Sequence, residues 1–217
     1  MPGTVVHLAF SGMIAAALLG AVYDRRSVLV VLGVTAFPDL DAFLALVTVV
    51  GHRALLHNFV IPLSGTVLVW ADTRLRTRSL LLNRLGPRGV RIAWVSILAY
   101  AVSAIGLDLV NGVVNPFWPV HDQFYTLDGR IELSDQRGVV QTFVDLGSEE
   151  SVVDSGGVGS SQEVNLSTGV DPDPSGEKTN PERIFPVVRS GWELVLLVVG
   201  TAVTVARFYL PHDLSGD

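Results

Sequence analysis

Residues 28–50 read VLVVLGVTAFPDLDAFLALVTVV, an apolar run that is interrupted by Asp39 and Asp41. The run exceeds the roughly 20 residues that a helix needs to cross a bilayer. A carboxylate at that depth costs about 2.5–3.5 kcal/mol or more unless it faces a polar cavity, a partner or a metal. The run therefore predicts a membrane helix that carries a functional site.

The composition of the whole chain also indicates a membrane protein. Of its 217 residues, 49% are hydrophobic and 17% are charged, whereas soluble domains have about 25% charged residues; the mean hydropathy is +0.46. We expect an all-α, multi-pass helical protein of the plasma membrane with about five transmembrane helices. The predicted spans are Val5–Tyr23, Ser27–Val50, Ala54–Ala71, Ile92–Val110 and Gly191–Leu210.

Arginine positions predict the orientation, because short cytoplasmic loops are enriched in basic residues. Arg25 and Arg26 follow the first span, and six further arginines lie in 74–91, after the third span. With five spans, both loops are cytoplasmic, whereas the N-terminus and residues 111–190 are outside. The polar residues of the spans then converge at the outer membrane face.

The chain has no cysteine, so any metal must be held by nitrogen and oxygen atoms. The net charge is −6, and Lys178 is the one lysine among fifteen basic residues. This preference for arginine together with an acidic exposed region resembles the composition of halophilic proteins. No nucleic-acid partner is predicted.

Four regions are expected along the chain. Residues 1–110 are expected to form a four-helix transmembrane region that carries the candidate metal site. Residues 111–145 are expected to form an external turn and a small β-hairpin around Asp128-Gly129, a strong turn signal. Residues 146–186 have too little apolar surface to fold and are predicted to be a disordered acidic linker. Residues 187–217 form the C-terminal transmembrane helix and a tail.

Asp39 and Asp41 are two residues apart, which places them about 200° apart on a regular helix. Pro38 removes a backbone donor and disfavours helix at Phe37, so we expect a local break that lets both carboxylates face one cavity. The alternative is that one of them caps a helix N-terminus. Capping requires a single carboxylate, so the pair favours a site.

Further ionisable residues follow in the chain. His52 and His57 flank Arg53 in 51–58, and they are candidate metal ligands or, alternatively, interfacial residues at a helix end. Arg53 is a candidate for binding an anion or anchoring to headgroups. His7 lies in the first span, and Asp108 follows sixteen uncharged residues.

These residues resemble the motifs of the YdjM-like family of membrane-bound, metal-dependent hydrolases. The resemblance covers residues 1–122: an early His7, Pro38-Asp39-Leu40-Asp41, His52-Arg53 with His57, and Asp108 followed by Asn115-Pro116-Phe117-Trp118-Pro119. Ala42 and Ala104 stand where the family has further histidines, and His121 is a candidate replacement.

The resemblance implies a hydrolase in which water activated by a divalent metal, zinc or manganese, attacks a lipid or phosphate-ester substrate at the outer interface. The expected metal ligands are His7, Asp39, Asp41, His52 and His57; the expected catalytic residues are Asp39, Asp41, His57 and Asp108; Arg53 is expected to bind substrate. A non-enzymatic membrane protein whose polar cluster ties helices together is the alternative. A cation path is disfavoured because the inner halves of the spans are aliphatic.

Overall fold

The structure is a computed structural model that describes residues 3–46, 52–129, 131–141, 158–164, 166–174, 176 and 178–210. It is mostly helical with one small antiparallel sheet. In chain order the elements are α1 (Thr4–Leu18), the 3₁₀ turn η1 (Gly20–Val22), α2 (Arg25–Ala36), the 3₁₀ turn η2 (Phe37–Leu40), α3 (Asp41–Leu44), α4 (Val60–Arg74), α5 (Leu80–Ala99), the π-helix η3 (Tyr100–Gly106), α6 (Leu107–Asn111), β1 (Ile131–Ser134), β2 (Gly138–Gln141) and α7 (Gly191–Arg207).

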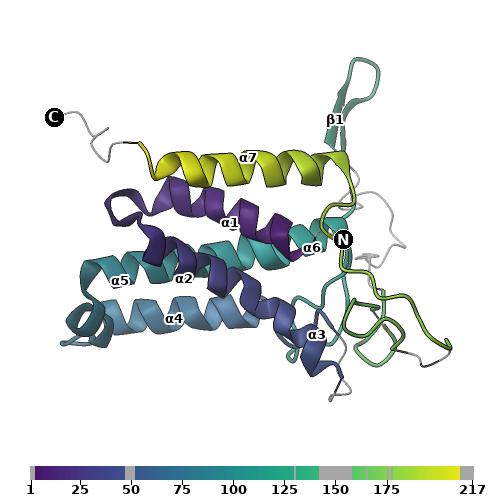
Figure 1. Cartoon of the computed structure of the whole chain (residues 1–217), viewed down its shortest axis with the longest axis horizontal. Coiled ribbons are helices and arrows are strands. Elements are labelled where there is room, and N and C mark those ends of the chain that lie inside the picture. The colour runs from purple at the N-terminus through teal and green to yellow at the C-terminus, as the bar shows by residue number, and fades with distance from the viewer. Residues whose placement is uncertain are drawn as a thin grey trace.

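The long helices lie side by side as a bundle (Figure 1). α1 packs against α7, α2 and α5, and α4 packs against α5. One end of the bundle holds the N-terminal start of α1 together with α3, α6 and the hairpin, and the opposite end holds the α1–α2 and α4–α5 connections. Successive long helices therefore run from one end of the bundle to the other and back.

Side-chain caps fix where three of the helices begin. Asp24 precedes α2 and accepts a hydrogen bond from the Ser27 amide at 2.8 Å, and the hydroxyl of Ser79 accepts from the Leu82 amide at 3.0 Å before α5. Ser190 caps α7 through the Glu193 amide. Each cap satisfies a backbone donor that the first helical turn leaves free.

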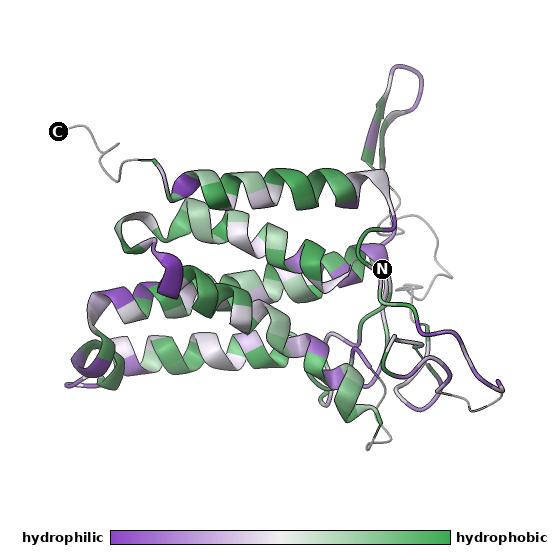
Figure 2. Ribbon diagram, viewed as in Figure 1, coloured by the Kyte–Doolittle hydropathy of each residue, from purple (hydrophilic) through white to green (hydrophobic). Residues whose placement is uncertain are grey.

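The outward faces of the helices are apolar. Large side chains on α2, α4 and α7 expose more than half of their surface: Leu29, Leu63, Leu68, Val195 and Val198. Figure 2 shows hydrophobic residues along the length of the bundle and hydrophilic ones mainly towards its ends. Two segments, Arg25–Leu44 and Leu80–Asn111, are long and apolar enough to cross a membrane, and Thr4–Leu18 is a shorter apolar helix.

The predicted count of five spans is therefore not confirmed by helix length and composition. α1 and α4 have 15 residues and α7 has 17, which correspond to about 22–25 Å at 1.5 Å per residue, whereas a bilayer core is about 30 Å thick. The third predicted span begins at Ala54, but α4 begins only at Val60, because residues 52–59 form a loop.

The predicted β-hairpin is confirmed, but its turn is not at Asp128-Gly129. β1 pairs with β2 from Ile131–Gln141 to Ser134–Gly138, around a turn at 135–137. Gly138 has φ +69°, a conformation that favours glycine, and the Ser134 hydroxyl accepts from the amides of the turn. The segment before Asp128 is used elsewhere, since Tyr125 pairs with Val114.

Several described residues of the predicted acidic linker contact the rest of the chain. We call the residues 158–164, 166–174 and 178–190 the strap. Phe124 forms a bridge with Gly159, and the Ser161 hydroxyl donates to Asp122 at 2.7 Å. Arg183 donates to the carbonyl of Val170 at 2.6 Å and so joins two parts of the strap. Polar contacts with the folded body thus replace the apolar surface that the acidic sequence lacks; residues 146–157 lie outside the described residues.

Candidate metal centre

The loop 52–59 carries both candidate histidines and is fixed by backbone hydrogen bonds. The carbonyl of Arg53 accepts from the Asn115 amide at 2.9 Å, and the amide of Phe59 donates to the Pro116 carbonyl at 2.8 Å. The Tyr100 hydroxyl donates to the carbonyl of Leu56 at 2.5 Å. Arg53 itself has φ +71°, so a left-handed residue bends the chain directly after His52 and permits both histidines to face inward.

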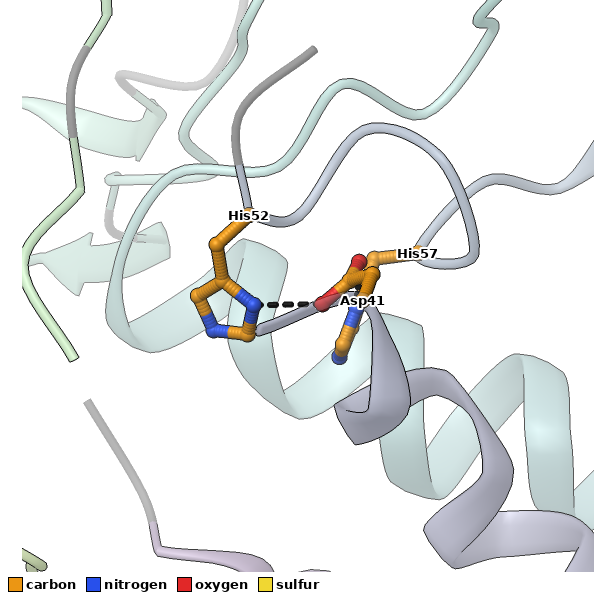
Figure 3. A group of neighbouring side chains, drawn as sticks. All are labelled: Asp41, His52 and His57. Carbon is orange, nitrogen blue, oxygen red and sulfur yellow. Dashed lines mark hydrogen bonds and ion pairs between the residues drawn. The ribbon is translucent and has the colours of Figure 1, made fainter. Parts of the chain in front are cut away.

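Asp41 lies between His52 and His57 (Figure 3). Its Oδ1 contacts Nδ1 of His52, and its Oδ2 lies 2.8 Å from Nδ1 of His57 and accepts from the Arg53 amide at 3.0 Å. Asp41 and His57 are buried, whereas His52 is partly exposed. One ligand atom from each of these three residues lies within 4.8 Å of the others, so the group could hold a metal ion.

The second nitrogen of His57 faces two more carboxylates. His57 Nε2 lies 3.4 Å from Oδ1 of Asp39 and 3.5 Å from Oδ2 of Asp108. Asp39 accepts a hydrogen bond from the Thr4 hydroxyl of α1 at 2.5 Å. The expected break at Pro38 takes the form of the tighter η2 turn, and the two aspartates approach the same imidazole from opposite sides.

Asp108 connects this group to α1 and to the loop. Its Oδ1 lies 2.8 Å from Nη2 of Arg53 and 3.2 Å from Nε2 of His7. Nδ1 of His7 contacts the carbonyl of Ser103 at 2.6 Å, and the Ser103 hydroxyl donates to the carbonyl of His7. Ser103 lies in the π-helix η3, a feature that often occurs at functional sites.

The charges of the buried cluster do not balance without a further cation or protonated imidazoles. Three carboxylates, those of Asp39, Asp41 and Asp108, face one guanidinium, that of Arg53, which leaves two negative charges. Burial opposes protonation of the loop residue His57, but the charge of Asp41 and the contact with Asp39 raise its pKa to about 9. A divalent cation would supply the same two positive charges.

The donor set therefore fits a divalent metal. Imidazole nitrogen and carboxylate oxygen are the ligands that zinc takes in the absence of thiolates, and manganese also accepts them. Nε of Arg53 is buried without a hydrogen-bond partner, and Nε2 of His57 is buried with its nearest carboxylate oxygens at 3.4 and 3.5 Å. Unsatisfied buried polar atoms are rare and commonly mark a functional role.

All six candidate residues of the metal centre and Arg53 are brought together, but not into one ligand shell. The geometric group comprises Asp41, His52 and His57, whereas Asp39, Asp108 and His7 lie on the Nε2 side of His57. His121 is not at the cluster: its Nε2 contacts the Tyr125 hydroxyl at 2.8 Å, and the residue is exposed. Thr4 and Ser103 also contact the cluster, and Tyr100 contacts the loop 52–59. They could not be predicted from the sequence, because a hydroxyl residue in or beside an apolar run carries no distinct signal.

A cavity of about 360 Å³ opens beside the metal centre. Its polar lining comes from Thr4, Asp39, His52, Arg53 and, in the strap, Ser167, Thr168 and Arg189. Its apolar lining comes from Val5, Ala42, Phe43, Val170, Ile184, Phe185 and Pro186. The strap therefore forms one wall of a cavity whose base is the cluster.

Comparison of the chain with protein-family models, with curated protein sequences and with solved structures finds no match. The resemblance to the YdjM-like family thus rests on the motifs of residues 1–122. The geometry shows a buried Asp41, His52 and His57 group that could hold a metal ion.

Proposed function

We propose that the chain is a membrane-embedded, metal-dependent hydrolase of the YdjM-like type that acts at the outer end of its helical bundle. The observation that carries the proposal is the buried group of Asp41, His52 and His57, whose ligand atoms lie within 4.8 Å of one another. Burying such a group is costly unless the charges are compensated. A bound divalent cation would compensate the negative charges and so offset this cost.

The apolar outer surface supports multi-pass embedding in the plasma membrane. Exposed large apolar side chains lie on α2, α4, α5 and α7, and large exposed apolar areas mark a membrane or protein contact. The arginines of 74–91 and of the α2 start lie at the end opposite the cluster. By the positive-inside rule that end is cytoplasmic, so the cluster is at the outer face.

The residues of the site have separable roles in this proposal. Asp41, His52 and His57 would hold zinc or manganese, which when bound supplies Lewis acidity and lowers the pKa of water. Asp39 lies at the wall of the cavity and beside His57, where its carboxylate can accept a proton from the attacking water. Asp108 holds the guanidinium of Arg53 at 2.8 Å and thus acts as a positioning residue.

The cavity favours an amphiphilic, anionic substrate. Arg53 and Arg189 contribute two positive charges to the lining against one negative charge from Asp39, and Arg53 also contacts Asp108 at 2.8 Å. Phe43, Ile184 and Phe185 supply apolar walls. A lipid or lipid-like phosphate ester matches both parts, because guanidinium groups bind phosphate oxygens and apolar walls bind hydrocarbon.

A second candidate function is a non-enzymatic membrane protein in which the cluster ties helices together. It is favoured by hydrogen bonds that join separate elements, from Thr4 to Asp39 and between His7 and Ser103. Such contacts contribute only about 0.6 kcal/mol on average in membranes. Tethering explains individual contacts. It does not explain why the buried carboxylates of Asp41 and Asp108 and the partly exposed carboxylate of Asp39 all lie near one imidazole.

Metal analysis of purified protein separates these two functions. We expect the wild-type chain to retain about one zinc or manganese ion, and Asp41→Asn, His52→Ala and His57→Ala each to lose metal affinity by at least about tenfold. His121→Ala is the matched control, because His121 is outside the cluster. Metal-free wild-type protein after loading, with correctly inserted variants, would favour tethering.

Phosphate release from phosphatidic acid tests the hydrolase itself, and Asp39→Asn should lower the rate while metal is retained.

Membrane topology can be tested independently, because the chain has no cysteine. Gln136 lies in the hairpin turn and Thr77 lies in the α4–α5 connection, at opposite ends of the bundle. A membrane-impermeant maleimide should label Gln136→Cys in intact cells and Thr77→Cys only after lysis. Equal labelling of both from outside would contradict the five-span topology.

A further inference from the structure

A second cavity, of about 570 Å³, lies at the end of the bundle away from the metal centre. It is formed where α2 begins beside α5. Its lining residues are Asp24, Arg25, Arg26, Ser27, Val30, Arg88 and Ile92. None of these residues belongs to the metal centre or to the substrate cavity beside it, so this cavity needs a separate explanation.

One arginine of this cavity is held in place by the cap of α2. Nη2 of Arg88 contacts Oδ2 of Asp24 and donates to the Ser27 hydroxyl at 2.9 Å. Asp24 accepts hydrogen bonds from the amide and hydroxyl of Ser27, and these contacts together with Arg88 lower its pKa to about 2. Asp24 is therefore ionised at neutral pH and orients Arg88 at the cavity.

The cavity carries a surplus of positive charge. Three arginines and one aspartate line it, which leaves two positive charges. No acidic side chain pairs with Arg25 or Arg26 among the residues that the structure describes. Two cations that face a cavity without a carboxylate partner are a binding arrangement for an anion, and guanidinium groups bind phosphate oxygens through paired hydrogen bonds.

The other lining residues are apolar. Val30 lies on α2 after the arginine pair, and Ile92 lies one helical turn after Arg88 on α5. Both apolar residues are therefore deeper along the bundle than the arginines. Figure 2 shows the hydrophilic start of α2 followed by hydrophobic turns. The cavity thus has a cationic mouth and an apolar inner part.

We propose that this cavity binds the phosphate group of an anionic phospholipid of the inner leaflet, with Arg25, Arg26 and Arg88 around the phosphate and an acyl chain along Val30 and Ile92. The inference rests on the membrane embedding proposed above and not on the metal chemistry. Basic pockets between membrane helices on the cytoplasmic side are suited to anionic headgroups. A free phosphate compound shares the headgroup chemistry but has no hydrocarbon chain to contact the apolar inner part.

Lipid retention by the intact purified chain tests the proposal. Native mass spectrometry counts phosphatidylglycerol and phosphatidylcholine adducts of wild-type protein in mild detergent, and a parallel titration replaces lipid with inorganic phosphate. We expect the protein to retain phosphatidylglycerol and to bind phosphatidylcholine about tenfold more weakly. We expect no phosphate adduct of the lipid-free protein at millimolar inorganic phosphate.

The decisive variant is the double substitution Arg25→Gln with Arg26→Gln, compared with Arg74→Gln and Arg78→Gln. The control pair removes the same charge at the same end of the bundle but does not line the cavity. The first pair should lower phosphatidylglycerol affinity by about tenfold or more, and the second should leave it unchanged. Equal loss in both pairs, or no loss in either, would overturn a defined site. Metal content should be unchanged in both pairs, so a failure here is distinct from a failure of the metal centre.

Discussion

His57 is the residue around which the candidate metal centre is built. Its Nδ1 lies 2.8 Å from Asp41, and its Nε2 lies within 3.5 Å of both Asp39 and Asp108. An imidazole presents two nitrogens in one plane, so a single side chain can contact carboxylates on opposite sides. This explains how Asp39 and Asp41, which diverge on a helix, can serve one site.

Replacement of Arg53 should lower the free energy of unfolding far more than is usual for a residue in a loop. Arg53→Ala removes the guanidinium that lies 2.8 Å from Asp108 and leaves that carboxylate buried. We expect a loss of about 3–5 kcal/mol in the free energy of unfolding. Denaturation of detergent-solubilised protein, followed by circular dichroism, provides the measurement.

Two comparisons make the prediction for Arg53 specific. The double substitution Arg53→Ala with Asp108→Ala should cost less than the sum of the single ones, because it removes both charges of the pair. Arg76→Ala breaks an exposed pair with Asp72 and should leave the free energy of unfolding nearly unchanged, because solvent screens such a pair. Additive effects of Arg53 and Asp108 would show that the buried pair is not coupled.

At the scale of elements, irregular helix turns place the polar residues. The η2 turn presents Asp39 and Asp41 to the cluster, and η3 brings the Ser103 carbonyl to His7. A regular helix would continue the apolar outward face at these positions. The two irregular segments therefore give apolar helices an inward polar end without adding a separate domain.

The packing of α1 against α7 depends on glycine at the point of closest approach. A Cβ atom added at Gly200 would lie 2.6 Å from the backbone oxygen of Ala9. Gly200→Ala must therefore push the helices apart, and we expect a loss of roughly 1–3 kcal/mol in the free energy of unfolding. Gly33→Ala is the control, because a Cβ there meets nothing within 4 Å, and it should be neutral or stabilising. Equal unfolding midpoints for both variants would contradict the close packing.

Most helices and the membership of the cluster could be predicted from the sequence, because long apolar runs and buried charges are strong local signals. The start of α4 could not be predicted from the sequence. The predicted span begins at Ala54, but hydrogen bonds with Asn115 and Pro116 hold residues 52–59 as a loop. The hairpin turn was misplaced because Tyr125 pairs with Val114, a partner outside the local sequence. The division of ligands between the two nitrogens of His57 also depends on contacts between distant segments.

At the scale of the whole molecule, the strap covers a site that the first 122 residues build. Asp122 is the point of attachment: it accepts from the Ser161 amide at 3.0 Å, from the Ser161 hydroxyl and from the Asn115 side chain. Asn115 in turn donates through its amide to the carbonyl of Arg53. A continuous set of hydrogen bonds thus runs from the strap to the backbone of Arg53.

Attachment of the strap should weaken in acid. Partial burial opposes ionisation of Asp122, but hydrogen bonds from Ser161 and Asn115 outweigh it and lower its pKa, with His121 adding positive charge. A carboxyl with a lowered folded-state pKa stabilises the fold above its unfolded pKa of about 4, and the effect is lost as the pH falls through the folded value. A fluorophore on Val158→Cys should therefore show lower anisotropy when the pH is reduced from 6 towards 3, while helix content is retained.

The variant Asp122→Asn separates this carboxyl from other acidic groups. The Glu163 carboxyl contacts Ser160 within the strap and therefore does not attach it to the body. Asp122→Asn should show the low anisotropy already at pH 7 and little further change in acid, because the charged acceptor is absent at every pH. The same label on Gln136→Cys, in the hairpin turn, should not respond to the substitution. High anisotropy of the Val158 label in Asp122→Asn at pH 7 would show that Phe124 and Gly159 hold the strap without the carboxylate.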